Sequence, residues 1–400
     1  MKILILSNKP PFPSNDGSSL ATLNMATGIA EAGNKVKILA FATQKHPCRV
    51  EEIPLELKNL IEFELVKIDT SIKPIKAIVN LVFSRLPFNI ERFINISYRQ
   101  KLIEILKNET FDIIQLEGLY LYPYINDVRF NCSTPIVYRS HNIEHEIWSR
   151  IATNERNPLK KFYFSLLSKR IAKLEKKISK QVNAIVAISK RDENWFITNG
   201  STIPTITIPS GYRNNHSSDI KGLNNNDICF VGSLDWIPNQ EGLTWFLDSI
   251  WLNIRKIIPN TSIHIAGRNA PSSLVLRLKN EPGVVFHGEI KDAKEFLNNF
   301  SILVVPLLSG SGMRVRIVEG MMLGKTIVTT SIGIEGIEAH NPEEVIIADD
   351  PSEFTNATIN LINNSDTRTS IAEKARIFAT SHYDIFILTQ RLTEFYKQVV

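Results

Sequence analysis

Residues 309–336, SGSGMRVRIVEGMMLGKTIVTTSIGIEG, predict a loop, a helix and a strand that belong to a parallel α/β sheet. The apolar run before them, ILVVPL at residues 302–307, predicts a strand buried on both faces. Helical spacing runs from residue 314 to 323, and Gly324 ends that helix. The β-branched residues 326–330 then predict the next strand. This order of elements is typical of a doubly wound sheet.

The loop between this strand and this helix has the features of an anion-binding site. The loop contains Gly310, Ser311 and Gly312 and is followed by a helix N-terminus. Unpaired backbone N–H groups of such a loop and helix point toward a ligand bound in the loop and favour an anion. Arg314 and Arg316 add fixed positive charge that suits forked contacts with phosphate oxygens.

Glu319 lies about one turn further along the helix, where a carboxylate cannot bind phosphate. It can accept hydrogen bonds from a pair of sugar hydroxyls, so the stretch favours a ligand that is anionic at one end and hydroxylated at the other. A nucleotide sugar fits. The alternative is that Arg314 and Arg316 form a solvated helix face, with Glu319 as the ion-pair partner of either.

The rest of the chain repeats the βα pattern in two halves of similar length. The asparagine-rich residues 211–226 predict a linker between an N-terminal domain, residues 1–210, and a C-terminal domain, residues 227–380. Both domains are expected to be doubly wound and Rossmann-like, of the α/β class, and to face each other across a cleft. Residues 381–400 predict an amphipathic C-terminal helix that crosses back to the first domain.

Composition places the chain among ordinary globular proteins, with 43% apolar and 22% charged residues. The three cysteines are scattered, which fits a reducing cytoplasm and argues against structural zinc. The apolar start of the chain is too short for a secretory signal, and no run reaches the about 18 residues of a membrane span. We therefore expect a cytoplasmic protein.

Charge is divided unevenly, since residues 1–200 hold 29 Lys and Arg against 20 Asp and Glu, while residues 201–400 hold 17 against 21. Residues 159–182 predict a long helix with an apolar stripe and, opposite it, a basic stripe of five lysines and Arg170. Such a stripe is either simply solvated or binds anionic lipid headgroups at the inner face of the membrane. No nucleic-acid partner is expected.

Two loops of the first half lie at the carboxyl ends of predicted strands, where open α/β sheets bind ligands. Asn15, Asp16 and Gly17 follow the first strand, as ligand contacts or as a turn that starts the next helix. His141 follows the strand at residues 135–139, and His145 lies one turn further on. Either histidine is a functional group or a structural one, and position favours His141 for function.

The chain resembles the GT-B glycosyltransferases, in particular the family-4 group of retaining enzymes, over nearly its whole length. In the first half the resemblance rests on NDG, SHNIEH, VAIS and IPSGYR, in the family's order. In the second half it rests on FVGSLDWIPN, IAGR, VVFHGEI and, most specifically, GSGMRVRIVEGMMLGKTIVTT.

The resemblance implies a role for each motif. Glu319 would bind the donor ribose, residues 310–316 the donor sugar and diphosphate, and residues 285–290, with Gly288, would frame the nucleobase. His141 would approach the transferred sugar, and residues 15–17 would lie near the diphosphate and acceptor.

The chain departs from the family pattern at two places. Ser311 stands eight residues before Glu319, where the family often has a glutamate. After the first strand of the second half, Ser233 follows Gly232 in place of the usual arginine, and Asn239 or Gln240 stands near the usual lysine. We expect Arg314, Arg316 and Arg268 to supply the missing charge, as in the similar exopolysaccharide-type branch.

The predicted function is a retaining glycosyltransferase that moves a sugar from a nucleotide sugar to a hydroxyl of a glycan or lipid-linked acceptor, in cell-surface polysaccharide synthesis. His141, Glu319 and Arg314 are the predicted catalytic residues. No Asp-x-Asp pair ends a strand, so metal independence is expected, with no cofactor and with a UDP- or GDP-sugar favoured over an ADP-sugar. The alternatives are a nucleotide-sugar epimerase or phosphorylase on the same fold, or an inactive nucleotide-sugar-binding protein.

Overall fold

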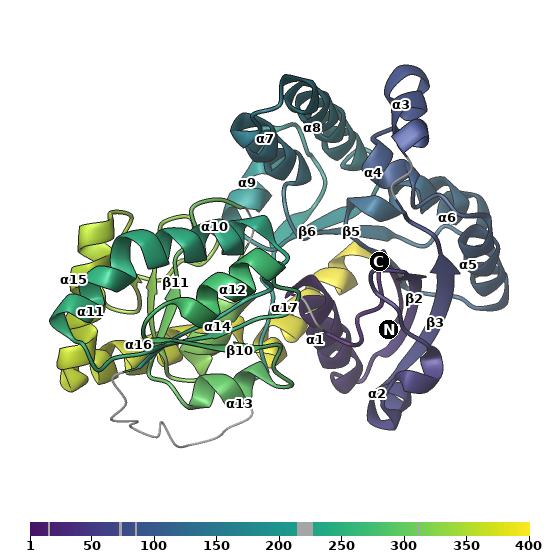
Figure 1. Cartoon of the computed structure of the whole chain (residues 1–400). Coiled ribbons are helices and arrows are strands. Elements are labelled where there is room, and N and C mark those ends of the chain that lie inside the picture. The colour runs from purple at the N-terminus through teal and green to yellow at the C-terminus, as the bar shows by residue number, and fades with distance from the viewer. Residues whose placement is uncertain (15–16, 72–73, 85, 214–226, 311–312) are drawn as a thin grey trace. The chain divides into compact units, whose positions relative to one another are not determined.

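The computed structural model describes residues 1–14, 17–71, 74–84, 86–213, 227–310 and 313–400 (Figure 1). The chain forms two compact units. The first contains Met1–Gly211 together with Ile385–Val400, and the second contains Tyr212–Asp384. Most of the predicted linker, from residue 214 to 226, lies outside the described residues.

The first unit is built on a seven-stranded parallel sheet with the order β3-β2-β1-β4-β5-β6-β7. Its strands are β1 (Lys2–Ser7), β2 (Lys35–Thr43), β3 (Ile61–Ile68), β4 (Ile113–Glu117), β5 (Ile136–Ser140), β6 (Ala184–Ala187) and β7 (Thr205–Thr207). Because the chain leaves β1 toward β2 and later returns to β4 on the other side, the topological switch point lies between β1 and β4.

Both faces of this sheet are buried. Leu4 and Leu6 of β1 belong to the core on one face, while Ile3 and Ile5 belong to the core on the other, as the alternation of side chains along a strand requires. The main covering helices are α1 (Gly17–Glu31), α5 (Ile96–Asn108), α6 (Ile125–Asn131), α7 (Glu144–Asn154), α8 (Pro158–Ile178), α9 (Lys190–Thr198) and α17 (Ile385–Val399). Shorter helices are α2 (Leu55–Leu60), α3 (Pro74–Phe83) and α4 (Phe88–Glu91).

The C-terminal helix α17 is part of the first unit. Leu388, Leu392 and Tyr396 are fully buried in the same core as Ile3 and Ile5. Gly28 of α1 permits close packing here, since a Cβ at this position would lie 2.4 Å from Oγ1 of Thr389.

The second unit has a six-stranded parallel sheet with the order β10-β9-β8-β11-β12-β13. The strands are β8 (Ile228–Val231), β9 (Ile263–Ala266), β10 (Val284–Gly288), β11 (Ile302–Val305), β12 (Thr326–Thr329) and β13 (Ile346–Ile347). The helices are α10 (Ile237–Phe246), α11 (Leu252–Ile257), α12 (Ser272–Asn280), α13 (Ala293–Asn298), α14 (Val315–Met322), α15 (Pro351–Asn363) and α16 (Ser365–Tyr383). Its switch point lies between β8 and β11, and the prediction of two doubly wound, Rossmann-like units is confirmed.

One predicted helix boundary was wrong. The sequence of residues 243–257 predicts a helix there, but the observed helix begins six residues earlier, at Ile237, and is divided by a π-helical turn at Leu247–Trp251. Pro238 and Gly242 indicated a loop, but proline is tolerated in the first helical turn because no hydrogen bond is lost there. Gly242 is required by packing, since a Cβ there would lie 2.1 Å from the carbonyl oxygen of Pro306.

Candidate active site

The carboxyl ends of three strands of the second unit are tied together by backbone hydrogen bonds. The N–H of Gly232, after β8, donates to the oxygen of Ala266 at 3.1 Å. The N–H of Gly267, after β9, donates to the oxygen of Gly288 at 2.8 Å. Gly288 has a φ of 67°, in the left-handed region that favours glycine. The predicted donor-binding residues Gly232 and Gly288 therefore share one edge of the sheet.

Arg268 lies at the same edge. Its Nε donates to Oγ of Ser233 at 3.3 Å, so the residue expected to supply charge reaches the position where the resemblance expects an arginine. The two positions are 35 residues apart in sequence. Only the pairing of β8 with β9 brings them together.

The loop after β11 meets the loop after β8. The Arg314 guanidinium lies over the ring of Trp236, with 5.2 Å between the guanidinium carbon and the ring centroid. Gly310 has a φ of 112°, and a Cβ there would lie 2.7 Å from Nη2 of Arg314. The predicted contacts Ser311 and Gly312 lie outside the described residues. Gly310, Arg314 and Trp236 thus form one cluster at the switch point between β8 and β11.

Glu319 is buried, with 5% of its surface exposed, and forms an ion pair with Arg316 one turn earlier in α14. Tyr212 also hydrogen-bonds to Glu319, and burial together with the Glu319 charge raises the pKa of Tyr212 well above its usual value. Arg316 is thus a partner of Glu319, as the alternative prediction for this helix allowed. Tyr212 was expected in the linker, but it belongs to the second unit, where its N–H donates to Tyr383.

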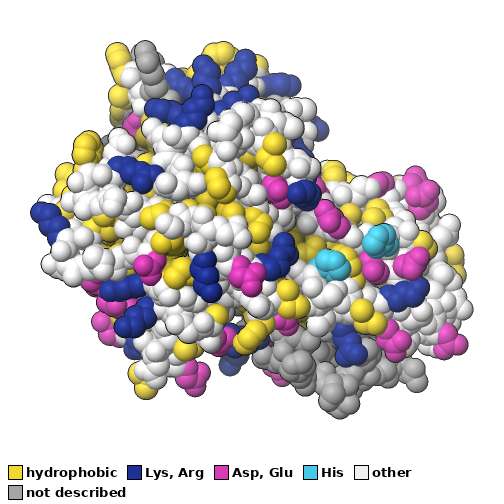
Figure 2. All heavy atoms as spheres, turned by 180° about the vertical axis from the view of Figure 1, so that it is seen from behind, with side chains coloured by type: hydrophobic (Ala, Val, Ile, Leu, Met, Phe, Trp, Pro, Cys, Tyr) yellow, Lys and Arg dark blue, Asp and Glu magenta, His cyan; other side chains and the backbone are white. Residues whose placement is uncertain are grey.

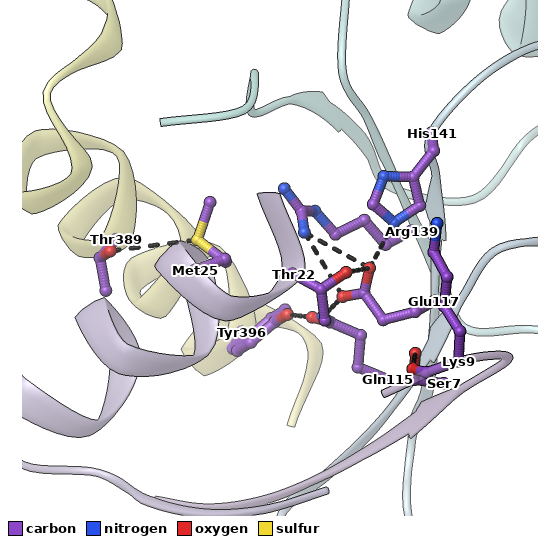
Figure 3. Close-up of polar contacts among 10 residues, drawn as sticks. All are labelled: Ser7, Lys9, Thr22, Met25, Gln115, Glu117, Arg139, His141, Thr389 and Tyr396. Carbon is purple, nitrogen blue, oxygen red and sulfur yellow. Dashed lines mark hydrogen bonds and ion pairs between the residues drawn. The ribbon is translucent and has the colours of Figure 1, made fainter. Parts of the chain in front are cut away.

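In the first unit, a buried carboxylate lies at the switch point, at the end of β4 (Figure 3). Nη1 of Arg139 lies 3.4 Å from each Glu117 oxygen, and Thr22 Oγ1 donates to Oε2 at 3.2 Å. Gln115 Nε2 and His141 Nε2 contact the remaining positions of the carboxylate. Burial opposes ionisation, but the positive charge of Arg139 and the hydrogen bonds with His141 and Gln115 lower the pKa of Glu117 to about 2. Glu117 is therefore a carboxylate anion at neutral pH.

The structure places His141 where the sequence predicted it, directly after β5. Its side chain is 12% exposed, and Glu117 is its hydrogen-bond partner among the described residues. Asn15 and Asp16 lie outside the described residues, and Gly17 is the first residue of α1. The same helix carries Thr22, so α1 reaches the Glu117 cluster through a different side chain from those predicted.

His145 belongs to a second, structural network. Glu175 of α8 is fully buried and accepts from Nδ1 of His145 and from the backbone N–H of Glu144, both at 2.6 Å. These contacts hold the first turn of α7 against α8. Burial and the Glu175 charge raise the pKa of Glu144 to about 7, and Tyr120 donates to Glu144 at 3.4 Å.

Sequence reasoning missed Glu117, Arg139, Tyr212 and Trp236 as site residues. Glu117 and Arg139 each carried a signal, because each is a charged residue in the last two positions of a buried strand. The signal could not identify their partners, because strand order is not written in local sequence. In the parts of the chain that the structure describes, no group of three or more His, Cys, Asp or Glu could hold a metal ion.

Two doubly wound sheets, each with a polar cluster at its switch point, place the protein in the class of two-domain Rossmann-like enzymes. Residues 15–213 match the family described as Glycosyltransferase Family 4, and residues 225–364 match the family described as Glycosyl transferases group 1. The chain belongs to these GT-B glycosyltransferases, and the predicted family is confirmed.

A curated relative, an uncharacterized 44.6 kDa protein in the cps region of Klebsiella pneumoniae, is 25% identical over 96% of each chain. Anabaena Alr3699/HepE, solved in complex with UDP, is similar in structure with a TM-score of 0.67, 17% identity and full coverage of both chains. Sucrose-phosphate synthase from Thermosynechococcus elongatus has a TM-score of 0.69 and 14% identity, over 100% of this chain and 99% of that one. At these identities the two structures establish the fold.

Proposed function

We propose that this protein transfers a sugar from a nucleoside-diphosphate sugar to a hydroxyl of a glycan or lipid-linked acceptor, with retention of configuration. The observation that carries the proposal is the buried Glu319 of α14, which is held by Arg316 of the same helix and by Tyr212. An anchored carboxylate beside a positively charged loop suits a ligand with a ribose and a diphosphate.

Each part of the second unit's cluster has a role in this proposal. Glu319 accepts hydrogen bonds from the ribose hydroxyls. Arg314, oriented by Trp236, stabilises the charge that develops on the departing diphosphate, and Arg268 adds to this preorganised positive field. Residues 285–290 frame the nucleobase. No metal ion or cofactor is proposed, and a UDP- or GDP-sugar is favoured over an ADP-sugar.

The relatives support the donor class and the pathway. Alr3699/HepE has been solved with UDP and with UDP-glucose. The Klebsiella pneumoniae relative is described as lying in a cps region, which supports a role in surface polysaccharide synthesis. In the first unit, His141 approaches the transferred sugar in this proposal.

A lipid-linked acceptor would bring the protein to a membrane surface. Exposed lysines lie along the solvent side of α8 and just beyond its end, namely Lys160, Lys161, Lys169, Lys173, Lys176, Lys177 and Lys180. Leu159 and Phe162 of this helix are 80% and 66% exposed, and Figure 2 shows Lys and Arg side chains beside hydrophobic ones on the first unit. This combination supports peripheral binding to anionic lipid at the inner face of the membrane.

Arg170 was predicted to belong to the basic stripe of α8, and the structure gives it a different role. Arg170 does not belong to the solvated face, because its Nη2 donates to the oxygen of Leu81 at 2.7 Å and so joins α8 to α3.

Within the described residues no helix is long and apolar enough to span a bilayer.

The test is binding of UDP, GDP, ADP and their common sugar conjugates, measured by thermal shift and calorimetry. One nucleotide is expected to stabilise the wild type selectively. Glu319→Ala should lose that stabilisation, while Glu373→Ala, which removes an exposed glutamate of α16, should keep it. No shift with any nucleotide would overturn the proposal.

Product analysis then separates the alternatives. Transfer to an acceptor hydroxyl supports a glycosyltransferase, whereas a donor converted without acceptor indicates an epimerase and a dependence on phosphate indicates a phosphorylase. Nucleotide binding without any turnover indicates an inactive binding protein.

A further inference from the structure

A hydrogen bond joins Glu117 and His141 at the first unit's switch point (Figure 3). The carboxylate is 2% exposed and the imidazole 12% exposed, so the pair lies at the boundary between core and solvent. Glu117 is the last residue of β4 and His141 follows the adjacent strand β5, and the register of the two strands places Glu117 opposite Arg139. His141 is therefore held from its inner side and accessible from its outer side.

Among the described residues, the hydrogen-bond partners of the Glu117 carboxylate other than His141 are all donors. Arg139 is a cation, and the Thr22 hydroxyl and the Gln115 amide nitrogen both donate to it. The orientation of Gln115 is fixed in turn, because its oxygen accepts from the hydroxyl of Tyr396 in α17. An ionised carboxylate accepts and cannot donate, so the imidazole nitrogen that faces it must carry a proton.

We infer that Glu117 is the positioning residue of His141, and that it fixes the neutral ring as the Nε2–H tautomer so that Nδ1 accepts a hydrogen bond from a hydroxyl of the bound sugar. This inference rests on the proposed function for the identity of the ligand. The tautomer itself follows from the geometry of the chain.

The cluster is suited to this role because the carboxylate cannot turn away from the ring. Its donors come from α1, β4 and β5, and α17 holds Gln115 in place. A buried carboxylate that accepts from Arg139, Thr22 and Gln115 orients its neighbour more firmly than a surface contact does. The tautomer of a histidine is set by the hydrogen bond that its other nitrogen makes.

The first experiment is NMR of the full chain labelled with ¹⁵N-histidine at neutral pH. The His141 signals are assigned by their loss in His141→Gln. The expected wild-type result is a protonated Nε2 and an unprotonated Nδ1. A wild-type ring that carries a proton on Nδ1 overturns the proposal, and this arm needs no variant that could fail to fold.

Glu117→Gln provides the second arm, because an amide can either accept from Nε2–H or donate to a bare Nε2. We expect the signals of both tautomers in this variant, and a His141 unchanged from wild type would overturn the proposal. Asp127→Asn is the matched control, since Asp127 pairs with Arg99 at 2.9 Å elsewhere in the same unit. It should leave the His141 signals as they are.

Kinetics link the tautomer to the reaction. Glu117→Gln is expected to lower kcat by up to about 100-fold, the effect of misplacing a positioned group, with the KM for the nucleotide sugar changed by less than about threefold. An unchanged kcat would overturn the catalytic part of the inference. Absence of turnover in the wild type, with the Nε2–H tautomer present, would refute the proposed function and leave the positioning role supported.

Discussion

Tyr396 in the C-terminal helix α17 donates a hydrogen bond to Gln115 in β4, 281 residues earlier in the chain. Gln115 in turn donates to Glu117. All three side chains are buried, so the last helix of the chain takes part in the polar network that ends at His141. The C-terminal helix thus supports the candidate site as well as the core.

Removing the Tyr396 hydroxyl tests this relationship. Tyr396→Phe leaves a buried Gln115 oxygen without its donor, which is expected to cost about 1–3 kcal/mol of stability. The measurement is the midpoint of urea unfolding of the first unit, followed by its near-UV circular dichroism. Tyr163→Phe is the control, because Tyr163 makes ring contacts in the same unit but its hydroxyl makes no hydrogen bond to any residue that the structure describes. Equal midpoints for the two variants would contradict the prediction.

Arg314 is expected to bind the diphosphate. Arg314→Gln should weaken binding of a nucleoside diphosphate by roughly 10- to 100-fold, the loss of about 1.5–3 kcal/mol from a charge-assisted contact. Binding of the nucleoside without phosphates should hardly change. Calorimetry with both ligands measures the difference, and Arg277→Gln, which removes a half-buried partner of Asp248 in the same unit, is the control. Equal losses for the two ligands would show that Arg314 acts on the fold and not on phosphate.

Glu144 predicts a pH dependence of stability. Burial and the Glu175 charge raise its pKa from the usual value of 4.5 to about 7 in the folded chain. A raised folded pKa favours the protonated form, so this contribution to stability is fully present below pH 4.5 and is lost as the pH rises through 7.

Glu144→Gln removes that titration. The variant should gain stability relative to wild type between pH 5 and pH 8, by up to about 3 kcal/mol. Melting temperatures across this range measure the gain, with Glu56→Gln, an exposed glutamate of α2, as the control. A difference between variant and wild type that does not depend on pH would exclude Glu144 as the titrating group.

Two glycines at the edge of the second sheet should respond differently to substitution. A Cβ at Gly267 would lie 2.1 Å from the backbone oxygen of Gly232, so Gly267→Ala must move one strand end and is expected to cost about 1–3 kcal/mol or more. Gly288 has open space around it but a positive φ, which asparagine tolerates. Gly288→Asn should therefore lower the melting temperature less than Gly267→Ala does, and the reverse order would contradict this account.

The basic face of α8 predicts lipid binding. Replacing Lys173, Lys176 and Lys177 with glutamate reverses the charge of this face. It should reduce the affinity for phosphatidylglycerol-containing vesicles, measured by flotation, at least about 100-fold, since each basic residue near an anionic surface contributes about 1 kcal/mol to membrane binding. Neutral phosphatidylcholine vesicles should show no such change. The control replaces Lys256, Lys279 and Lys291, which are exposed in the second unit, with glutamate. An equal loss in both variants would indicate a general effect of net charge.

The sequence by itself determined the class of fold, because apolar strands, amphipathic helices and glycine-rich turns are local patterns with fixed periods. It also placed His141 directly after one buried strand and Arg314 before the helix that follows another, since the carboxyl ends of parallel strands are where such sheets bind ligands. The helix start at Ile237 was missed because the requirement for Gly242 comes from Pro306, which is remote in sequence.

Only the tertiary structure decided which charges meet. Glu117 pairs with His141 and Arg139 because β4 and β5 are neighbours, and Tyr212 reaches Glu319 across more than one hundred residues of chain. Strand order and packing are properties of the whole chain, whereas residue type and spacing are properties of each segment. The residue types from which a ligand class was predicted were therefore visible in the sequence, while the network that orients its side chains was not.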